Sequence, residues 1–156
     1  MLGAAAQYFT RIDVAIFAAA VADYRPEYFE KQKIKKDSAE FYLKMVPNPD
    51  IAFEFSKRKS PEQISVGFAL ETNDLLENAR AKLAKKRFDF IVMNSASELG
   101  AGFGSDTNRI AILNRNGQLR NYGLKQKSEV ARDIIEYLFA FARRSAALPT
   151  LQEVAS

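Results

Sequence analysis

Lysine, arginine and the acidic residues must carry any chemistry in this sequence, because its 156 residues include neither histidine nor cysteine. Their absence removes the commonest general base, the commonest transition-metal ligand, every thiol nucleophile and every disulfide bond. Phosphoryl and nucleotidyl transfer need neither residue, because their barriers fall by positioning and charge neutralisation. The net charge of +4 and the pI near 9.3 are consistent with an anionic substrate.

The motif AAAVADYRP, Ala18 to Pro26, places small residues and then Asp23 after an apolar run. In open α/β sheets a ligand binds beyond the carboxyl ends of the strands, and small side chains let a base approach the backbone there. The motif therefore indicates a ligand site. Alternatively, its alanines serve only helix–sheet packing and Asp23 caps a turn.

Two groups of lysines could bind phosphates. The run KQKIKK, Lys31 to Lys36, could act as a clamp, because a lysine neutralises a developing oxyanion without changing its protonation state. Lys82 and Lys86 lie four residues apart, on one face of an expected helix, where they could hold a triphosphate. In both places the alternative is a solvated charged surface.

Two other segments fit a nucleotide site. PNPDI, Pro47 to Ile51, opens an expected helix whose free backbone N–H groups and positive dipole end suit an anion. GFALETN, Gly67 to Asn73, ends an expected strand, and its Phe68 could stack on a ribose or a base. An ordinary capped helix and a core aromatic residue are the structural alternatives.

The glycine-rich segment GAGFGSDTN, Gly100 to Asn108, superficially resembles a phosphate-binding loop. It lacks the Gly-Lys-Ser/Thr ending and no helix follows it, which excludes a P-loop. A turn into the next strand is expected instead. Ser105, Asp106 or Asn108 could still contact a substrate from that turn.

Three apolar runs predict the central strands of an α/β fold: Asp13–Ala20, Gln63–Leu70 and Asp89–Met93. Near-continuous apolar runs are typical of strands buried on both faces, so we expect three parallel core strands. Asn73–Arg87 has helical spacing and predicts a crossover helix between the last two strands. The expected fold is a three-layer, Rossmann-like, mostly parallel sheet with helices on both faces.

A short helix and a hairpin complete the expected sheet region. In the helix, from Asn48 to about Lys57, Asn48 supplies an N-cap, followed by a proline and an early acid. Asn-Gly between Arg109–Asn114 and Leu119–Tyr122 predicts a C-terminal antiparallel hairpin at the sheet edge.

The C-terminal segment predicts a closing amphipathic helix from Ser128 to about Arg143. Its repeating apolar residues are Val130, Ile134, Ile135, Leu138 and Phe139. No repeat or linker marks a second domain, so residues 1–144 are expected to form one domain and 145–156 a flexible tail. With no apolar run long enough to span a membrane and no signal peptide, a cytoplasmic location is expected.

Taken in order, these motifs closely resemble those of phosphopantothenate-cysteine ligases. The resemblance runs from about Asp13 to about Tyr137 and rests on AAAVADYRP, KIKK, NPDI, GFALET, the Lys82/Lys86 pair and FGSDTN. The family's Gly-rich opening turn matches nothing in Met1 to Thr10. The resemblance therefore implies the CTP-binding domain of such a ligase with its N-terminal βα unit missing.

The resemblance implies a CTP-dependent ligase of coenzyme A biosynthesis. In the family, the carboxylate of 4'-phosphopantothenate attacks the α-phosphate of CTP and releases pyrophosphate. The amine of cysteine then displaces CMP from the acyl-cytidylate and gives 4'-phosphopantothenoylcysteine. Mg²⁺ is expected with the CTP, bound mostly by phosphate oxygens and water, and no FMN is expected in this portion.

The resemblance also assigns roles to individual residues. Lys33 would be the catalytic residue, neutralising charge near the α-phosphate, and Asp23 would bind the ribose. Lys82 and Lys86 would hold phosphates. The remaining residues assigned to the nucleotide site are Phe17, Ala18, Ala19, Pro49, Asp50, Ile51, Ala52 and Phe68.

The family implies partners as well. A homodimer is expected, with Tyr24–Val46 as an interface arm, because Glu40–Val46 alternates like an exposed strand. In bacteria the domain often follows a flavin-dependent decarboxylase, and neither nucleic acid nor a membrane is an expected partner. The rival interpretation is a non-catalytic module that binds nucleotides or nucleic acid through its basic residues. A dinucleotide-dependent oxidoreductase is disfavoured, because no G-x-G-x-x-G motif is present.

Overall fold

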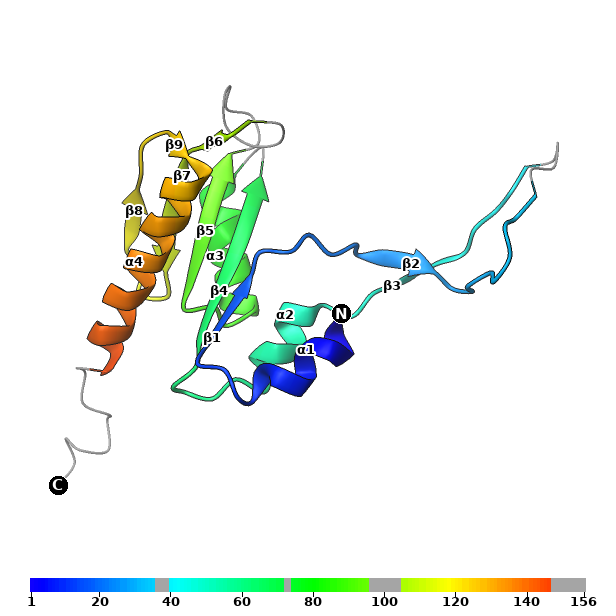
Figure 1. The fold of residues 1–156 in the computed structure, drawn as a ribbon, viewed down its shortest axis with the longest axis horizontal. Helices are drawn as coiled ribbons and strands as arrows, with labels where there is room; N and C mark the ends of the chain where they lie inside the picture. Colours follow the sequence, from blue (N-terminus) through cyan, green and yellow to red (C-terminus); the bar gives the residue numbers. More distant parts are fainter. Residues whose placement is uncertain (36–39, 72–73, 96–104, 147–156) are drawn as a thin grey trace.

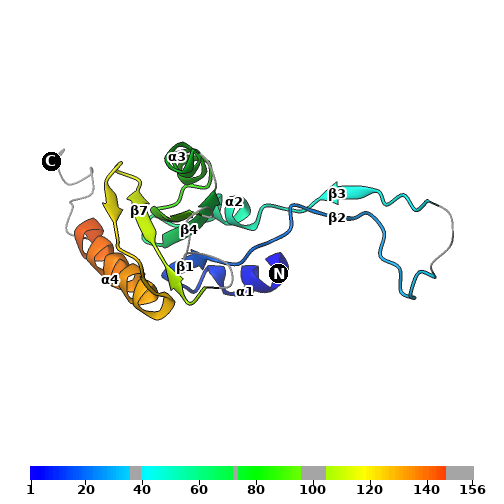
Figure 2. The ribbon, with the colours of Figure 1, turned by 90° about the horizontal axis from the view of Figure 1, so that it is seen from above.

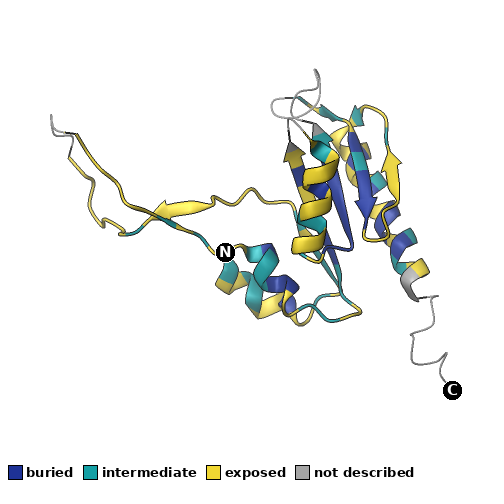
Figure 3. Ribbon diagram, turned by 180° about the vertical axis from the view of Figure 1, so that it is seen from behind, coloured by how far each residue is buried: buried dark blue, intermediate teal, exposed yellow. Residues whose placement is uncertain are grey.

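A computed structural model describes residues 1–35, 40–71, 74–95 and 105–146 of the protein. Over these residues, the chain forms a body with a five-stranded sheet and carries a long arm that projects away from it (Figure 1). The body supplies the buried core, whereas the arm is almost entirely exposed (Figure 3).

The central sheet has the strand order β1-β4-β5-β7-β8. β1 (Val14–Phe17), β4 (Ile64–Glu71) and β5 (Phe90–Ser95) are parallel neighbours. β7 (Ile110–Asn114) and β8 (Leu119–Asn121) extend the sheet as an antiparallel hairpin. The predicted α/β fold, its three parallel strands and its C-terminal hairpin are confirmed, in a sheet that is mixed as a whole.

Helices cover both faces of this sheet (Figure 2). α4 (Lys127–Ala146) packs on one face, over a core that includes Phe90 and Val92 of β5. α3 (Leu75–Lys85) packs on the other face, over Ile91 of the same strand. Because successive side chains of β5 enter different cores, its sequence is apolar without alternation.

The N-terminal helix α1 (Leu2–Phe9) packs against the short helix α2 (Ile51–Ser56). Their contact includes the stacked rings of Phe9 and Phe55, whose centroids are 4.3 Å apart. Gln63 secures the same region, since its amide donates to the Phe9 carbonyl at 2.6 Å. These contacts hold α1 beside the sheet edge formed by β1.

The arm leaves the body between β1 and α2. At its root, β2 (Tyr24–Pro26) pairs antiparallel with β3 (Met45–Pro47). The predicted strand from Glu40 to Val46 is therefore wrong in its extent. The side chains of the arm that are both aromatic and strongly exposed are Tyr24, Tyr28, Phe29, Phe41 and Tyr42.

Two local sequence signals at the hairpin have clear structural causes. Gly117 has a φ of +80°, a conformation that favours glycine in the turn between β7 and β8. Asn114 accepts from the backbone N–H groups of Asn116 and Gln118, both at 3.0 Å, and so shapes this turn. An additional ribbon, β6 (Thr107–Asn108) with β9 (Lys125–Gln126), was not expected from the sequence.

The first predicted strand is wrong in length and burial. β1 ends at Phe17, so Ala18 to Ala20 lie beyond it, and Ile16 is 44% exposed. The reason is position: β1 is the edge strand of the described sheet and pairs only with β4. An apolar run alone does not distinguish an edge strand from a central one.

The predicted helices also need correction. The N-cap of α2 is Asp50, which accepts from the Phe53 N–H group at 3.1 Å, and not Asn48. In α4, Ile135 and Phe139 are exposed. The face of this helix that packs on the core contains Tyr137 and Phe141 instead. α4 also extends into the predicted tail as far as Ala146, and residues 147–156 lie outside the described ranges.

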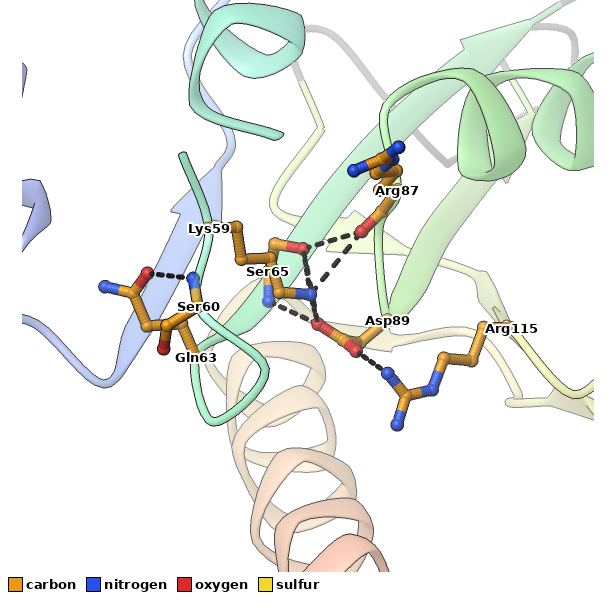
Figure 4. A network of polar contacts seen from close by, with 7 residues as sticks. All are labelled: Lys59, Ser60, Gln63, Ser65, Arg87, Asp89 and Arg115. Atoms are coloured by element: carbon orange, nitrogen blue, oxygen red, sulfur yellow. Dashed lines mark hydrogen bonds and ion pairs between the residues drawn. The ribbon is translucent and has the colours of Figure 1, made fainter. Parts of the chain in front are cut away.

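A buried carboxylate, Asp89, joins three segments at the amino end of β5 (Figure 4). It pairs with Lys59 and accepts from the Ser65 N–H group and the Arg115 guanidinium, each at 2.7 Å. The Asp89 side chain is only 3% exposed and that of Lys59 is 11% exposed. This network connects the loop after α2, strand β4 and the hairpin turn.

We predict that Asp89→Asn destabilises the protein by about 3–5 kcal/mol, because it leaves the Lys59 ammonium without its buried anionic partner. Chemical denaturation measures the change. Asp74→Asn is the matched control, since Asp74 is exposed, makes no side-chain cap bond and has a positive φ that asparagine tolerates. Equal stability of the two variants would contradict a structural role for the Asp89 network.

Candidate functional site

A cavity of about 630 Å³ lies along β1 and beyond its carboxyl end. Segments from α1, β1, the turn before α2, β4 and the end of α3 all contribute to its lining. Its volume falls within the range of about 300–1,000 Å³ usual for small-molecule sites. The cavity is thus large enough for a nucleotide.

Phenylalanines form an apolar wall of this cavity. The Phe17 ring lies 6.2 Å from that of Phe55 and 5.7 Å from that of Phe88, between centroids. Phe68 of β4 also lines the cavity and is 37% exposed, so its ring is available to a ligand. Gly67 is needed here, because a Cβ atom on it would lie 2.2 Å from the Phe88 ring.

The polar groups of the cavity include an ion pair between Asp50, the N-cap of α2, and Lys86, the C-cap of α3. Lys86 Nζ lies 3.1 Å from Asp50 Oδ2, across from the end of α3. Burial raises the pKa of Asp50, but the hydrogen bond from Phe53 N–H and the Lys86 ammonium together hold that pKa below its ordinary value. Asp50 and Lys86 therefore form a pre-existing ion pair at the cavity wall.

Most of the residues that the sequence assigned to a nucleotide site meet at this cavity. Those that line it are Phe17, Ala19, Asp23, Pro49, Asp50, Ile51, Ala52, Phe68, Lys82 and Lys86. Ala18 does not line it, and Lys33 lies on the arm, outside the cavity lining. Within one chain, the structure therefore separates Lys33 from the other predicted residues.

The other residues that the sequence suggested for substrate binding are not among the described residues that line the cavity. Ser105, Asp106 and Asn108 do not line it. Lys36 and residues 100–104 lie outside the described ranges. At the start of α2, where the sequence predicted an anion site, the Asp50 carboxylate accepts from Phe53 N–H, so this backbone donor already has a partner.

Sequence reasoning missed several residues of the cavity. Tyr8 and Phe9 of α1 line it, as does Asn48, whose amide bonds the carbonyl of Ala22. No sequence signal marked α1, since a short segment before the first strand has no periodicity that points to a site. Asn48 did carry a signal, but the pattern Asn-Pro-Asp was assigned to helix capping.

Two further observations limit the kinds of site. Among the described residues, no group of three or more histidine, cysteine, aspartate or glutamate side chains could hold a metal ion. In the same part of the chain, every helix is too short or too polar to cross a bilayer.

Comparison with known proteins identifies the family. Residues 1–141 match the model of the DNA/pantothenate metabolism flavoprotein C-terminal domain. The chain belongs to this family.

Two curated relatives and one solved structure show how far the similarity extends. The chain is 47% identical over 135 residues to a "Cysteine/Cysteine sulfinic acid decarboxylase" from an unknown prokaryotic organism, covering 86% of this chain and 38% of that protein. It is 38% identical over 133 residues to the "Coenzyme A biosynthesis bifunctional protein CoaBC" of Bacillus subtilis strain 168, covering 85% and 32%.

The crystal structure of the C-terminal domain of a coenzyme A biosynthesis bifunctional protein CoaBC superposes with a TM-score of 0.69 and 30% sequence identity. The match covers 88% of this chain and 58% of that chain. The chain thus spans about a third of the length of the curated relatives it matches. Their two names differ, and each describes a much longer protein.

We predict that Asp50→Asn lowers stability at neutral pH and that this difference disappears in acid. Asparagine also caps helices, so the variant loses mainly the ion pair with Lys86. Because the folded pKa of Asp50 is depressed, its contribution is present above about pH 4 and is lost as pH falls through the folded value. Urea denaturation at pH 7 and pH 3 measures this, with exposed Asp13→Asn as control. A pH-independent difference would contradict the ion pair.

Proposed function

We propose that the cavity binds CTP and that the chain is the nucleotide-handling part of a phosphopantothenate-cysteine ligase. The observation that carries the proposal is the convergence, in one cavity, of Asp23, Phe68, Lys82 and Lys86 from separate segments. Membership of the family supports the same conclusion, as does the relative named for coenzyme A biosynthesis.

The cavity offers a different surface to each part of the nucleotide. In this proposal, small residues and backbone groups of the segment after β1 contact the cytosine, and Asp23, which lines the cavity, accepts from ribose hydroxyls. Phe68 packs on the nucleoside. Lys82 and Lys86 supply positive charge for the phosphates, at the side of the cavity formed by α3 and its C-cap.

A phosphate must displace the Asp50 carboxylate to bind Lys86 directly. This exchange is possible because the ion pair is partly exposed, with the Lys86 and Asp50 side chains 25% and 39% accessible. A triphosphate carries more charge than one carboxylate and competes well for the ammonium. The ion pair therefore holds the Lys86 ammonium at the cavity wall until the nucleotide arrives.

The proposed reaction has two steps. A carboxylate oxygen of 4'-phosphopantothenate bonds to the α-phosphorus of CTP, and the bond to the β-phosphate oxygen breaks, releasing pyrophosphate. The cysteine nitrogen then bonds to the acyl carbon, CMP leaves with the electron pair, and the nitrogen loses a proton. Lysines that stay protonated suit the first step, because negative charge accumulates on phosphate oxygens.

Mg²⁺ fits the oxygen donors of the cavity. Asp23 and Asp50 are its aspartates, and Mg²⁺ usually binds one or two carboxylates together with phosphate oxygens and water. Phosphate oxygens and water would supply most of its ligands, because Asp50 is paired with Lys86 and Asp23 is assigned to the ribose. The ion supplies charge neutralisation to the phosphates when it is bound.

We assign Lys33 to a site completed by a second copy of the chain. Lys33 lies on the arm, which projects from the body, so it does not reach its own cavity in this structure (Figure 1). The arm exposes large apolar side chains, including Phe29 at 88% and Tyr42 at 85%. Exposed apolar surface of this kind favours a protein interface, and a homodimer would bury it.

CTP with Mg²⁺ is predicted to raise the melting temperature more than ATP with Mg²⁺ does. A ligand at 100 times its Kd that binds only the folded protein stabilises it by about 2.7 kcal/mol. Lys82→Ala should reduce the CTP shift, whereas Lys127→Ala, at the start of α4 and away from the cavity, should not. Equal melting-temperature shifts with both nucleotides would count against the proposal. In a separate DNA-binding assay, salt-sensitive binding of random DNA would favour the alternative of a nucleic-acid-binding module.

The chain is predicted to sediment as a dimer of about twice 17.5 kDa. Phe29→Glu should give a monomer, because it places a charge in the proposed apolar interface. Phe139→Glu, which changes an exposed phenylalanine on α4 of the body, should leave the dimer intact. Analytical ultracentrifugation decides the matter: dimers of the Phe29 variant would refute an interface formed by the arm.

A further inference from the structure

Asn48 lies where the two walls of the cavity meet, and both ends of its side-chain amide are bonded. The Nδ2 group donates to the Ala22 carbonyl oxygen at 2.8 Å. The Oδ1 atom accepts from the Arg25 guanidinium at 3.2 Å. The backbone N–H group of Asn48 also donates to the Asp23 carbonyl oxygen, at 2.7 Å. One residue thus binds two positions after β1, Ala22 and Asp23, and one position of β2, Arg25.

These bonds join two segments of the cavity lining. Ala22 and Asp23 end the wall that follows β1. Asn48 is followed directly by Pro49 and Asp50, which belong to the other wall. The hydrogen bonds of Asn48 therefore set the separation of the two walls where Asp23 enters the cavity.

An asparagine amide suits both partners. Its nitrogen donates to the carbonyl of Ala22 while its oxygen accepts from Arg25. A carboxylate would turn an oxygen toward the Ala22 carbonyl, and an alanine would bind neither group. Arg25 also donates to the Pro47 carbonyl at 2.9 Å, so its guanidinium keeps a partner when the Asn48 side chain is removed.

The Asn48 contacts lie outside the core. Asn48 is half-buried and Arg25 is exposed, and neither belongs to the two apolar clusters that hold the sheet and its helices. The backbone of Lys82 and Lys86 is held by α3 and its C-cap, and Asp50, the partner of Lys86, is held by its own bond from Phe53 N–H. Loss of the Asn48 side chain should therefore loosen one side of the cavity and leave the lysine side unchanged.

We infer that Asn48 is a positioning residue for the nucleoside part of the ligand, acting through the backbone of Ala22 and Asp23. The inference rests on the proposed function, because it takes the ligand to be a nucleotide whose phosphates meet Lys82 and Lys86. Asn48 fixes where the sugar and base lie, and the lysines fix where the phosphates lie.

The test compares CTP with inorganic tripolyphosphate, both with Mg²⁺, by titration calorimetry. Asn48→Ala should weaken CTP binding about tenfold, because Ala22, next to the ribose partner Asp23, loses its side-chain hydrogen bond, while the backbone bond from residue 48 to Asp23 remains. Tripolyphosphate, which lacks the nucleoside, should bind both proteins equally. Asn121→Ala, an exposed position on β8, is the matched control and should change neither affinity.

Unchanged CTP affinity in Asn48→Ala overturns the inference, as does an equal loss for CTP and tripolyphosphate, which indicates general loosening. Asn48→Leu keeps the volume of the side chain and should repeat the selective loss if the alanine variant does not fold. Failure of both variants to fold also contradicts the inference. If the wild-type protein does not bind CTP, the proposed function itself is refuted. The wild-type titration shows this before any variant is measured, so the two failures can be distinguished.

Discussion

The parallel pairing of β1 with β4, and of β4 with β5, is the constraint on which the cavity depends. This register places Phe17 opposite Gly67 and Gly67 opposite Ile91, so the carboxyl ends of the three strands point toward one edge. Gly67 has no side chain, which lets the Phe88 ring lie against the strand and meet Phe17. A different register would move Phe68 and the segment after β1 away from each other.

Charge is arranged around this scaffold in two distinct ways. At the amino end of β5, Asp89 is buried and fully engaged with Lys59, Ser65 and Arg115, so its role is structural. At the cavity, the pair of Asp50 and Lys86 is partly exposed and open to exchange with an anion. In a protein without histidine, lysine is suited to bind an anion, since a lysine ammonium ordinarily keeps its charge throughout the physiological range.

Local sequence signals correctly predicted the helices and strands whose formation depends mainly on residues close together in the sequence. The Asn-Gly turn gave the hairpin, and the apolar run of β5 gave a strand buried on both faces. Edge position is not a local property, so the exposure of Ile16 could not be predicted. Ile135 and Phe139 of α4 were misplaced for a related reason, because apolar content does not fix which stripe meets the core.

The order of motifs indicated residues that the fold brings to one cavity, but it could not indicate the long-range geometry that separates Lys33 from them. Asp23, Phe68, Lys82 and Lys86 are distant in sequence, and only the fold shows that they share a cavity. Lys33 is close in sequence to Asp23 but lies on the arm, because the paired strands β2 and β3 carry it away from the body. The competing uses of Asn48, as a helix cap or as a bridge to Ala22, could not be distinguished without coordinates.

A crystal structure of the protein with CTP and Mg²⁺ tests the central claim most directly. The account predicts phosphate oxygens about 3 Å from the Nζ atoms of Lys82 and Lys86, with the cytosine beside the segment that follows β1. Asp50 should then be separated from Lys86. A nucleotide bound on another surface at saturating CTP, with the Asp50–Lys86 pair intact, would contradict the account.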